Sequence, residues 1–295
     1  MTRIKAELLL LIAATLWAGT FPVIKISLDT FPPFLFIGIR FLIAAILFSV
    51  IFYGKIPLNN YKAVRAGLIL AFFQMTGFGS QTLGMVYTSA SNSALITGIC
   101  ILIVPFVQYF VIKKGLTIEN WIGVAIVSAG LFLLTQPFES GLNTGDAITM
   151  ICTFSWAFYI VLLDPYSKEN DINVLIFVQF WFVALISLAI SFIFEDFSSI
   201  IISSTDYLSI LYMSLAATFV TTIIGNRNQK YTTPIRTSII FTWEQPAAVM
   251  LSIFFLGEKF NAVQIVGGIL MVAGILFSET FEYIRTLLQK STKAA

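Results

Sequence analysis

The sequence predicts an all-α integral membrane protein whose ten transmembrane helices form two inverted five-helix repeats. The 295 residues are 58% hydrophobic and only 11% charged, whereas soluble domains contain about 25% charged residues. Apolar runs of about 20 residues, the length that a membrane-spanning helix requires, recur along the chain. Several short motifs of the first half recur in the second half, which predicts a duplicated architecture.

The apolar runs define the expected spans, and the polar stretches between them are too short for a sizeable soluble domain. The first run follows Arg3 and Lys5, as in a signal peptide. It lacks a clear small-residue cleavage site and precedes many similar runs, so we expect it to be the first span. The expected spans are residues 7–26, 33–53, 66–86, 93–112, 120–136, 146–163, 173–194, 207–226, 236–256 and 262–278.

The distribution of basic residues predicts the orientation of these spans. With the N-terminus in the cytoplasm, the inside segments carry 14 of the 17 Lys and Arg residues. The outside ends carry only Lys25 and Lys259, and Arg40 lies within a span. Cytoplasmic loops of membrane proteins carry an excess of Lys and Arg. We therefore expect both termini to lie in the cytoplasm, and the protein to lie in the cell inner (cytoplasmic) membrane.

Repeated motifs divide the chain into two halves of five spans. Since five is odd, the second half enters the membrane from the opposite side, which is the inverted repeat of many secondary transporters. We expect a first repeat over residues 1–140, a second over 141–285 and a cytoplasmic tail over 286–295. The matched residues, at offsets of 139 to 144, are Trp17 with Trp156, Tyr87-Thr88-Ser89 with Tyr231-Thr232-Thr233, Pro105 with Pro246, and Gly123 and Gly130 with Gly267 and Gly274.

The ninth expected span contains a carboxylate, an amide and a helix breaker in a row: Glu244, Gln245 and Pro246. A charged side chain near the bilayer centre costs several kcal/mol and marks a functional site by default. A proline inside a helix removes one backbone hydrogen bond and bends the helix. We expect helix breaks at Pro246 and at its counterpart Pro105, with the substrate site beside them.

Motifs in both halves together resemble a known family. The chain resembles an EamA-type member of the drug/metabolite transporter superfamily over about residues 6–280. This resemblance implies ten helices around a central cavity that opens alternately to each side, and transport of small metabolites, among which amino acids and their analogues are common. The motifs are Trp17-Ala18-Gly19-Thr20-Phe21, Arg40-Phe41-Leu42, Ser91-Asn92-Ser93-Ala94-Leu95 through Pro105, Glu244-Gln245-Pro246 through Leu256-Gly257-Glu258, and Gln264-Ile265-Val266-Gly267-Gly268 with Gly274.

The two halves are chemically unequal, because the first has Ile103-Val104-Pro105 where the second has Glu244-Gln245-Pro246. A carboxylate at Glu244 that alternates between a proton and the substrate is a simple coupling device. The structural alternative is a neutral or paired glutamate that only holds helices together. Arg40 stays charged and needs a partner or water. Anchoring at the outer interface or pairing with Glu244 is favoured over direct contact with a substrate carboxylate.

The other candidate substrate-binding residues are aromatic or carry amides. Trp17 and Phe21 are four residues apart and therefore share a helix face. With their counterparts on span six they predict an aromatic wall or a cation–π cage, although ordinary packing is the alternative. Span three is unusually polar, and its amides are expected to line the cavity or to cross-link helices. The full set is Trp17, Phe21, Arg40, Gln74, Gln81, Trp156, Tyr159, Glu244 and Gln245.

These observations favour a secondary transporter that exports a small organic metabolite, such as an amino acid, an analogue or a drug-like compound, by alternating access. The expected partners are the lipid bilayer, the substrate and a coupling proton; a homodimer stays open, and no nucleic acid is expected. The chain has no histidine, no metal-ligand cluster and no nucleotide-binding loop, and Cys100 and Cys152 are expected in the core. We therefore predict no enzyme activity and no cofactor. The alternatives are a membrane-embedded enzyme and a carrier of lipid-linked sugars or nucleotide sugars.

Overall fold

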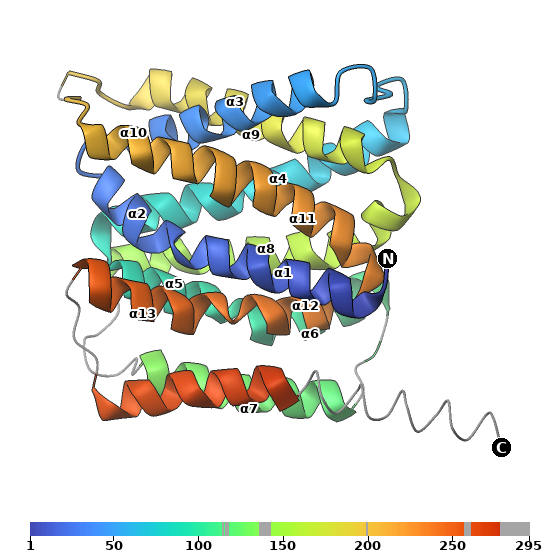
Figure 1. Cartoon of the computed structure of the whole chain (residues 1–295), viewed down its shortest axis with the longest axis vertical. Helices are drawn as coiled ribbons and strands as arrows, with labels where there is room; N and C mark the ends of the chain where they lie inside the picture. Colours follow the sequence, from blue (N-terminus) through green and yellow to red (C-terminus); the bar gives the residue numbers. More distant parts are fainter. Residues whose placement is uncertain (114, 116–117, 136–142, 199, 257–260, 278–295) are drawn as a thin grey trace.

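The computed structural model describes residues 1–113, 115, 118–135, 143–198, 200–256 and 261–277. All regular structure among them is helical, and the helices run side by side in one bundle (Figure 1). The expected tail, residues 286–295, lies outside the described residues. Seven described segments are long and apolar enough to cross a membrane: Arg3–Ser27, Pro33–Ile51, Ala90–Ile112, Thr144–Glu169, Ile172–Phe194, Ser204–Tyr231 and Pro234–Phe255.

Several of these segments consist of more than one helix. The first half of the chain contains α1 (Arg3–Ala18), α2 (Thr20–Ser27), α3 (Pro33–Ile51), α4 (Tyr61–Tyr87), α5 (Ala90–Gly98), α6 (Cys100–Ile112) and α7 (Ile118–Thr135). The second half contains α8 (Thr144–Glu169), α9 (Ile172–Phe194), α10 (Ser204–Leu211), the π-helix Tyr212–Val220, α11 (Thr221–Asn228), the short 3-10 helix Gln229–Tyr231, α12 (Pro234–Phe241), α13 (Glu244–Leu256) and a last apolar helix, Ala262–Phe277.

Two interruptions occupy corresponding positions in the two halves. One separates α5 from α6 at Ile99, and the other separates α12 from α13 at Thr242 and Trp243. Pro246 is the third residue of α13, a position where the missing N–H leaves no hydrogen bond unmade. Pro105 lies inside α6, beyond the interruption at Ile99. The second interruption therefore adjoins its proline, whereas the first does not.

A third interruption, at Gly19 between α1 and α2, contacts the π-helix. The carbonyl of Leu16 accepts a hydrogen bond from the Tyr212 hydroxyl, and the Trp17 indole donates to the carbonyl of Ala217 at 3.0 Å. Both partners belong to the π-helix Tyr212–Val220. Single-turn π-bulges occur frequently at functional sites. The described part of the bundle is thus least regular where α1 meets the π-helix and where α12 meets α13.

Glycines bring helices of the two halves into backbone contact. A side-chain carbon added at Gly145 of α8 would lie 2.5 Å from the Gly84 carbonyl of α4. At the other edge of the bundle, a carbon added at Gly130 of α7 would lie 2.7 Å from the Gly267 carbonyl of the last helix. Small residues such as Gly130 and Gly267 permit this close helix packing.

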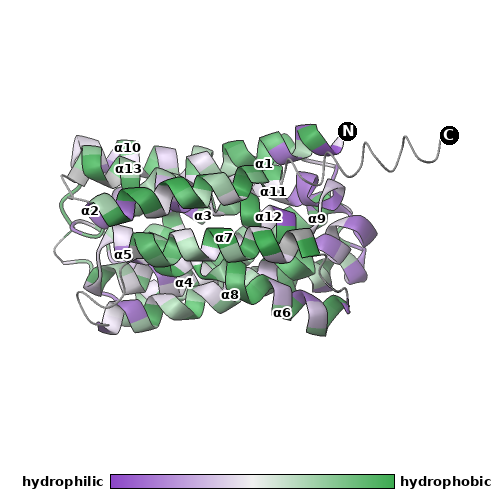
Figure 2. Ribbon diagram, turned by 90° about the horizontal axis from the view of Figure 1, so that it is seen from below, coloured by the Kyte–Doolittle hydropathy of each residue, from purple (hydrophilic) through white to green (hydrophobic). Residues whose placement is uncertain are grey.

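Hydrophilic residues gather toward the ends of the bundle, most densely at the end that holds the N-terminus (Figure 2). At one end, Arg236 of α12 donates to Glu7 of α1 at 2.8 Å, and Lys62 pairs with Glu169. At the opposite end, the Lys25 ammonium donates to the carbonyls of Met85 and Thr88 at 2.7 and 2.9 Å. Most residues between the two ends are apolar, as a membrane-spanning bundle requires.

Candidate functional site

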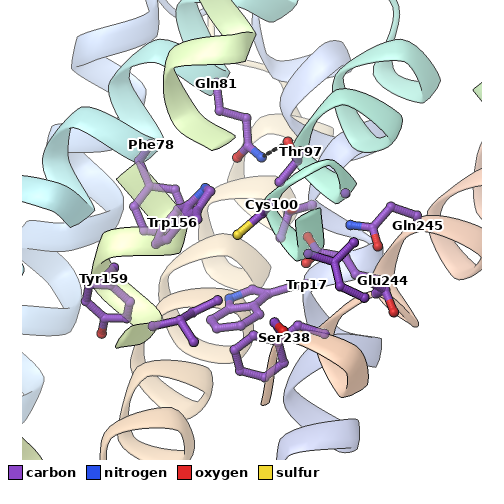
Figure 3. A pocket seen from close by; sticks show the side chains of 16 residues that line it. Trp17, Phe78, Gln81, Thr97, Cys100, Trp156, Tyr159, Ser238, Glu244 and Gln245 are labelled. Atoms are coloured by element: carbon purple, nitrogen blue, oxygen red, sulfur yellow. Dashed lines mark hydrogen bonds between the residues drawn. The ribbon is translucent and has the colours of Figure 1, made fainter. Parts of the chain in front are cut away.

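A cavity opens inside the bundle, between the interrupted helices and their neighbours (Figure 3). It has a volume of about 70 Å³ for the centres of water-sized molecules, so it is narrow in this conformation. Helices of both halves contribute to its wall. The lining residues are Trp17, Thr20, Phe78, Gln81, Thr97, Gly98, Cys100, Ile101, Trp156, Tyr159, Ile160, Ser238, Phe241, Thr242, Glu244 and Gln245.

Glu244 gives the cavity its only acidic side chain among the described lining residues. It is the first residue of α13, directly after the interruption at Thr242 and Trp243. A carboxylate in the first turn interacts favourably with the helix dipole. Its side chain has neither a hydrogen bond nor an ion pair with any residue in the described part of the chain. This carboxylate therefore faces the cavity with its hydrogen-bonding capacity unused.

Amide and hydroxyl groups also line the cavity. Two of them, on Gln81 and Thr97, come from the first half of the chain. Gln81 of α4 donates through Nε2 to the Thr97 hydroxyl of α5 at 3.0 Å. The Gln245 side chain is 3% exposed, and its Oε1 has no partner in the described part of the chain. It passes close to Gly98, where an added side-chain carbon would lie 2.9 Å from Gln245 Cγ. A larger residue at position 98 would therefore require the Gln245 side chain to shift.

Aromatic rings form the rest of the wall. Trp17 packs edge-on against Phe241, with 5.0 Å between ring centroids. On the opposite side, Trp156 packs edge-on against Phe78 at 4.8 Å and against Tyr159 at 5.7 Å. Figure 3 shows Trp156 and Tyr159 on one side of the cavity, Glu244 and Gln245 on the other, and Trp17 between them. The carboxylate and the aromatic faces thus share one space.

The structure brings six of the nine expected substrate-binding residues to this cavity and leaves three outside it. The six are Trp17, Gln81, Trp156, Tyr159, Glu244 and Gln245. Phe21 instead packs in an apolar cluster with Phe31 and Phe36, because the interruption at Gly19 shifts the helix face after Trp17. Gln74 is buried, and its Oε1 has no partner in the described part of the chain.

Arg40 is the third residue outside the cavity. Its side chain is fully buried, so it does not reach the membrane surface as an interface anchor. No ion pair joins it to Glu244 among the described residues. Its Nε donates to the Thr218 hydroxyl of the π-helix at 2.8 Å. The guanidinium lies over the ring of Phe78, which itself lines the cavity.

Sequence reasoning missed several lining residues, mainly Thr20, Thr97, Cys100, Ser238 and Thr242. Four of them lie next to or near an interruption of a helix. Small hydroxyl residues are common in membrane helices, so their composition carries no signal. The positions of the helix interruptions would have pointed to these residues, because irregular backbone within the membrane is tolerated where it lines a cavity.

The site offers no ready place for a resident metal ion. In the part of the chain that the structure describes, no group of three His, Cys, Asp or Glu side chains converges. The chemistry available at the cavity is instead a carboxylate, amides and aromatic faces. Carboxylates pair with ammonium groups, and cations also bind over aromatic faces. The cavity therefore suits a small molecule with a positively charged amino group and an apolar body.

Comparisons with known proteins agree on one family. The model of the EamA-like transporter family matches residues 4–136 and again residues 143–280. An uncharacterized transporter of Archaeoglobus fulgidus is 28% identical over 93% of this chain and 85% of its own length. An Escherichia coli protein named "Probable amino-acid metabolite efflux pump" is 23% identical over 92% of this chain and 93% of its own. One crystal structure superposes with a TM-score of 0.76 at 14% identity, covering 95% of this chain and 98% of the other.

Proposed function

The chain belongs to the EamA-like transporter family, and from this premise we propose that it exports a small metabolite with a cationic amino group by alternating access. Amino acids and their analogues are the substrate class that the cavity fits best. The names of two relatives, from Escherichia coli and Salmonella typhimurium, include amino-acid metabolite efflux. Membership of the family and seven candidate spans make the chain a multi-pass membrane transporter.

The unpaired carboxylate of Glu244 carries this proposal. In a membrane protein an ionisable side chain without a partner is costly unless it faces water or a ligand. Glu244 faces a cavity, next to an interrupted helix, and aromatic rings of Trp17 and Phe241 lie beside it. An ammonium group bound there neutralises the carboxylate and contacts the ring faces. When the substrate leaves, a proton takes its place, which couples transport to the proton gradient.

The two family matches support two repeats, over residues 1–140 and 141–285. In this proposal α4, α7 and the helix Ala262–Phe277 complete a set of ten spans with the seven candidates. The paired interruptions at Ile99 and at Thr242 and Trp243 lie where the repeats meet, as in other transporters with inverted repeats. Rocking of one repeat against the other opens the cavity to each side in turn.

The basic end of the bundle is proposed to face the cytoplasm, with both termini on that side of the inner membrane. Arg3, Lys62 and Arg236 lie at this end, whereas the acidic residues Asp146, Glu195 and Asp206 lie toward the other. This distribution is the one that the excess of basic residues in cytoplasmic loops predicts.

Transport in proteoliposomes with an imposed pH gradient tests the proposal. The assay compares wild type with Glu244→Gln across a panel of radiolabelled amino acids and their amines. We expect wild type to move a member of the panel faster when the gradient drives proton exchange, and Glu244→Gln to lose this response. The matched control is Glu169→Gln, which makes the same change at an exposed ion pair with Lys62.

Equal transport by wild type and Glu244→Gln would make Glu244 a structural residue and remove the coupling mechanism. Loss of response in both Glu244→Gln and Glu169→Gln would point to a general defect. If wild type moves nothing on the panel, the amino-group assignment is wrong, and sugars and drug-like compounds form the next panel.

A further inference from the structure

Arg40 is a buried cation without a counter-ion. Its side chain has no exposed surface, and it lies inside the apolar helix α3. No acidic side chain in the described part of the chain forms an ion pair with it. Nε donates to the Thr218 hydroxyl, but Nη1 and Nη2 have no partner among the described residues. A buried charge of this kind costs several kcal/mol unless a partner compensates for it.

Aromatic rings enclose the guanidinium. The carbon Cζ lies 4.6 Å from the ring centroid of Phe78 and 5.3 Å from that of Phe41. Cation–π contacts of this kind offset part of the burial cost, but they leave the N–H groups unpaired. The Phe78 ring also lines the cavity. Phe78 therefore contacts the guanidinium of Arg40 and also lines the cavity that holds Glu244.

The π-helix supplies the hydrogen-bond partner of this cation and a second buried hydroxyl. Thr218, which accepts from Arg40 Nε, belongs to it and donates in turn to the Met213 carbonyl at 2.7 Å. Ser214, one turn earlier on the same helix, is fully buried, and its hydroxyl has no partner in the described part of the chain. A guanidinium and a hydroxyl that both lack partners are suited to an anion, to which both donate.

We propose that Arg40 is the binding site for a carboxylate group of the transported molecule, reached when the Phe78 side chain turns away from the guanidinium. The inference rests on the proposed function. It extends that function from an amine to a molecule with both charges: the amino group binds at Glu244 and the carboxylate at Arg40. Planar guanidinium groups match carboxylates with two parallel hydrogen bonds. A free chloride ion carries the same single negative charge as a carboxylate, so it is the alternative ligand for Arg40.

Three related probes separate the two charged sites. Phenylalanine carries both charges, phenethylamine lacks the carboxylate and 3-phenylpropanoate lacks the amine. Binding to purified protein is measured by thermal stabilisation in a methanesulfonate buffer, which contains neither chloride nor a carboxylate. We expect Arg40→Gln to weaken the binding of phenylalanine and 3-phenylpropanoate about tenfold or more, because charged hydrogen bonds are lost. The binding of phenethylamine should be unchanged. Glu244→Gln should weaken phenylalanine and phenethylamine but not 3-phenylpropanoate.

Two further variants distinguish the loss of a binding site from a general folding defect. Arg40→Lys keeps the charge and should retain part of the 3-phenylpropanoate binding. Arg227→Gln is the matched control, since Arg227 also lies over an aromatic ring, that of Phe52 at 5.0 Å, but has a partner in Asn173. Arg227→Gln should leave the affinity for all three probes unchanged.

The outcomes distinguish this inference from the proposed function. If Arg40→Gln and Arg40→Lys weaken all three probes equally, or none, the carboxylate site is wrong whatever Glu244→Gln does. If Glu244→Gln weakens the binding of all three probes equally, or of none, while Arg40→Gln gives the expected result, the amine site at Glu244 is wrong. The carboxylate site at Arg40 is then supported. Chloride in place of methanesulfonate tests the alternative ligand: if chloride stabilises wild type but not Arg40→Gln, and 3-phenylpropanoate stabilises neither, Arg40 is a chloride site and the carboxylate proposal is wrong. If neither chloride nor 3-phenylpropanoate stabilises wild type, Arg40 binds no anion.

Discussion

Buried polar side chains in this bundle fall into two groups that differ in their hydrogen bonding. Tyr159, Gln179 and Asn226 form a closed set: Tyr159 donates to Gln179 Oε1 at 2.8 Å, Asn226 donates to the Tyr159 hydroxyl, and Gln179 donates to Asn226 Oδ1. Glu244 and Arg40, by contrast, keep unused polar atoms among the described residues. Completed networks hold helices together, whereas the unused groups of Glu244 and Arg40 are the ones that we propose to bind the substrate.

Tyr159→Phe should lower stability and leave substrate binding nearly unchanged. The ring still lines the cavity, but the Gln179 carbonyl oxygen loses its donor, and an unsatisfied buried group costs about 1–3 kcal/mol. Thermal unfolding in detergent and the affinity for a transported amine measure the two effects. Tyr109→Phe, at an exposed tyrosine of α6, is the control. A normal unfolding temperature with weakened binding would show that the hydroxyl contacts the substrate instead.

The thiol of Cys100 should report occupancy of the cavity. Cys100 lines it, whereas Cys152 is fully buried beside Thr97. In a Cys152→Ala background we expect a transported substrate to slow alkylation of Cys100 by N-ethylmaleimide several-fold, because a bound molecule occupies the same space. Mass spectrometry of the intact protein measures the rate, and Cys100→Ala gives the background. The same alkylation rate with and without saturating substrate would place the binding site elsewhere.

At the scale of elements, most of the ten expected spans coincide with helices, but the breaks within them were harder to predict. Glu244 and Gln245 stood out because polar residues are rare in apolar runs. Pro246 located the second interruption, whereas Pro105 did not locate the first. Phe21 was expected beside Trp17 because an unbroken helix puts residues four apart on one face. The break at Gly19 depends on distant contacts with the π-helix, which no local pattern contains.

Helices α4 and α8 approach each other so closely that a single methyl group should disturb them. In Gly145→Ala the new carbon would lie 2.5 to 2.8 Å from backbone atoms of Gly84, Tyr87 and Thr88, so the helices must move apart. We expect a loss of stability of about 1–3 kcal/mol, seen as a lower unfolding temperature. Gly225→Ala is the matched control, because nothing lies within 4 Å of the added carbon.

The control should be neutral or stabilising by up to about 1 kcal/mol, since alanine favours helices over glycine. Equal unfolding temperatures for Gly145→Ala and Gly225→Ala would mean that the contact between α4 and α8 is looser than the structure has it.

At the scale of the whole molecule, the two ends of the bundle are closed by different chemistry. A buried ion pair between Glu7 and Arg236 joins α1 to α12 at one end, and the Thr232 hydroxyl also donates to Glu7 at 2.9 Å. At the other end, the Lys25 ammonium joins α2 to the carbonyls that end α4. In the proposed cycle, opening either end would require its contacts to break, so each end would set its own barrier.

Glu7→Gln should open the end that is expected to face the cytoplasm. Removing one partner of a buried ion pair costs about 3–5 kcal/mol, and this pair joins α1 to α12, both of which contribute residues to the cavity wall. In inside-out vesicles of the Cys152→Ala background, a membrane-impermeant thiol reagent should then modify Cys100 faster. Glu169→Gln breaks only an exposed pair and should change nothing. An unchanged rate in Glu7→Gln would mean that this ion pair does not control access.

The single carboxylate of the cavity also has an electrical consequence. The first half has no carboxylate at the position that matches Glu244, so this one side chain is the acidic group that balances the charge of Arg40, whose guanidinium lies over the cavity-lining ring of Phe78. With Glu244 deprotonated the two charges cancel, whereas a proton on Glu244 leaves the charge of Arg40 uncompensated. One elementary charge that crosses the full field gains or loses about 2.3 kcal/mol per 100 mV. In the proposed cycle, the voltage across the cell membrane would therefore set how fast the protonated, unloaded carrier reorients, even when the molecule that it carries has no net charge.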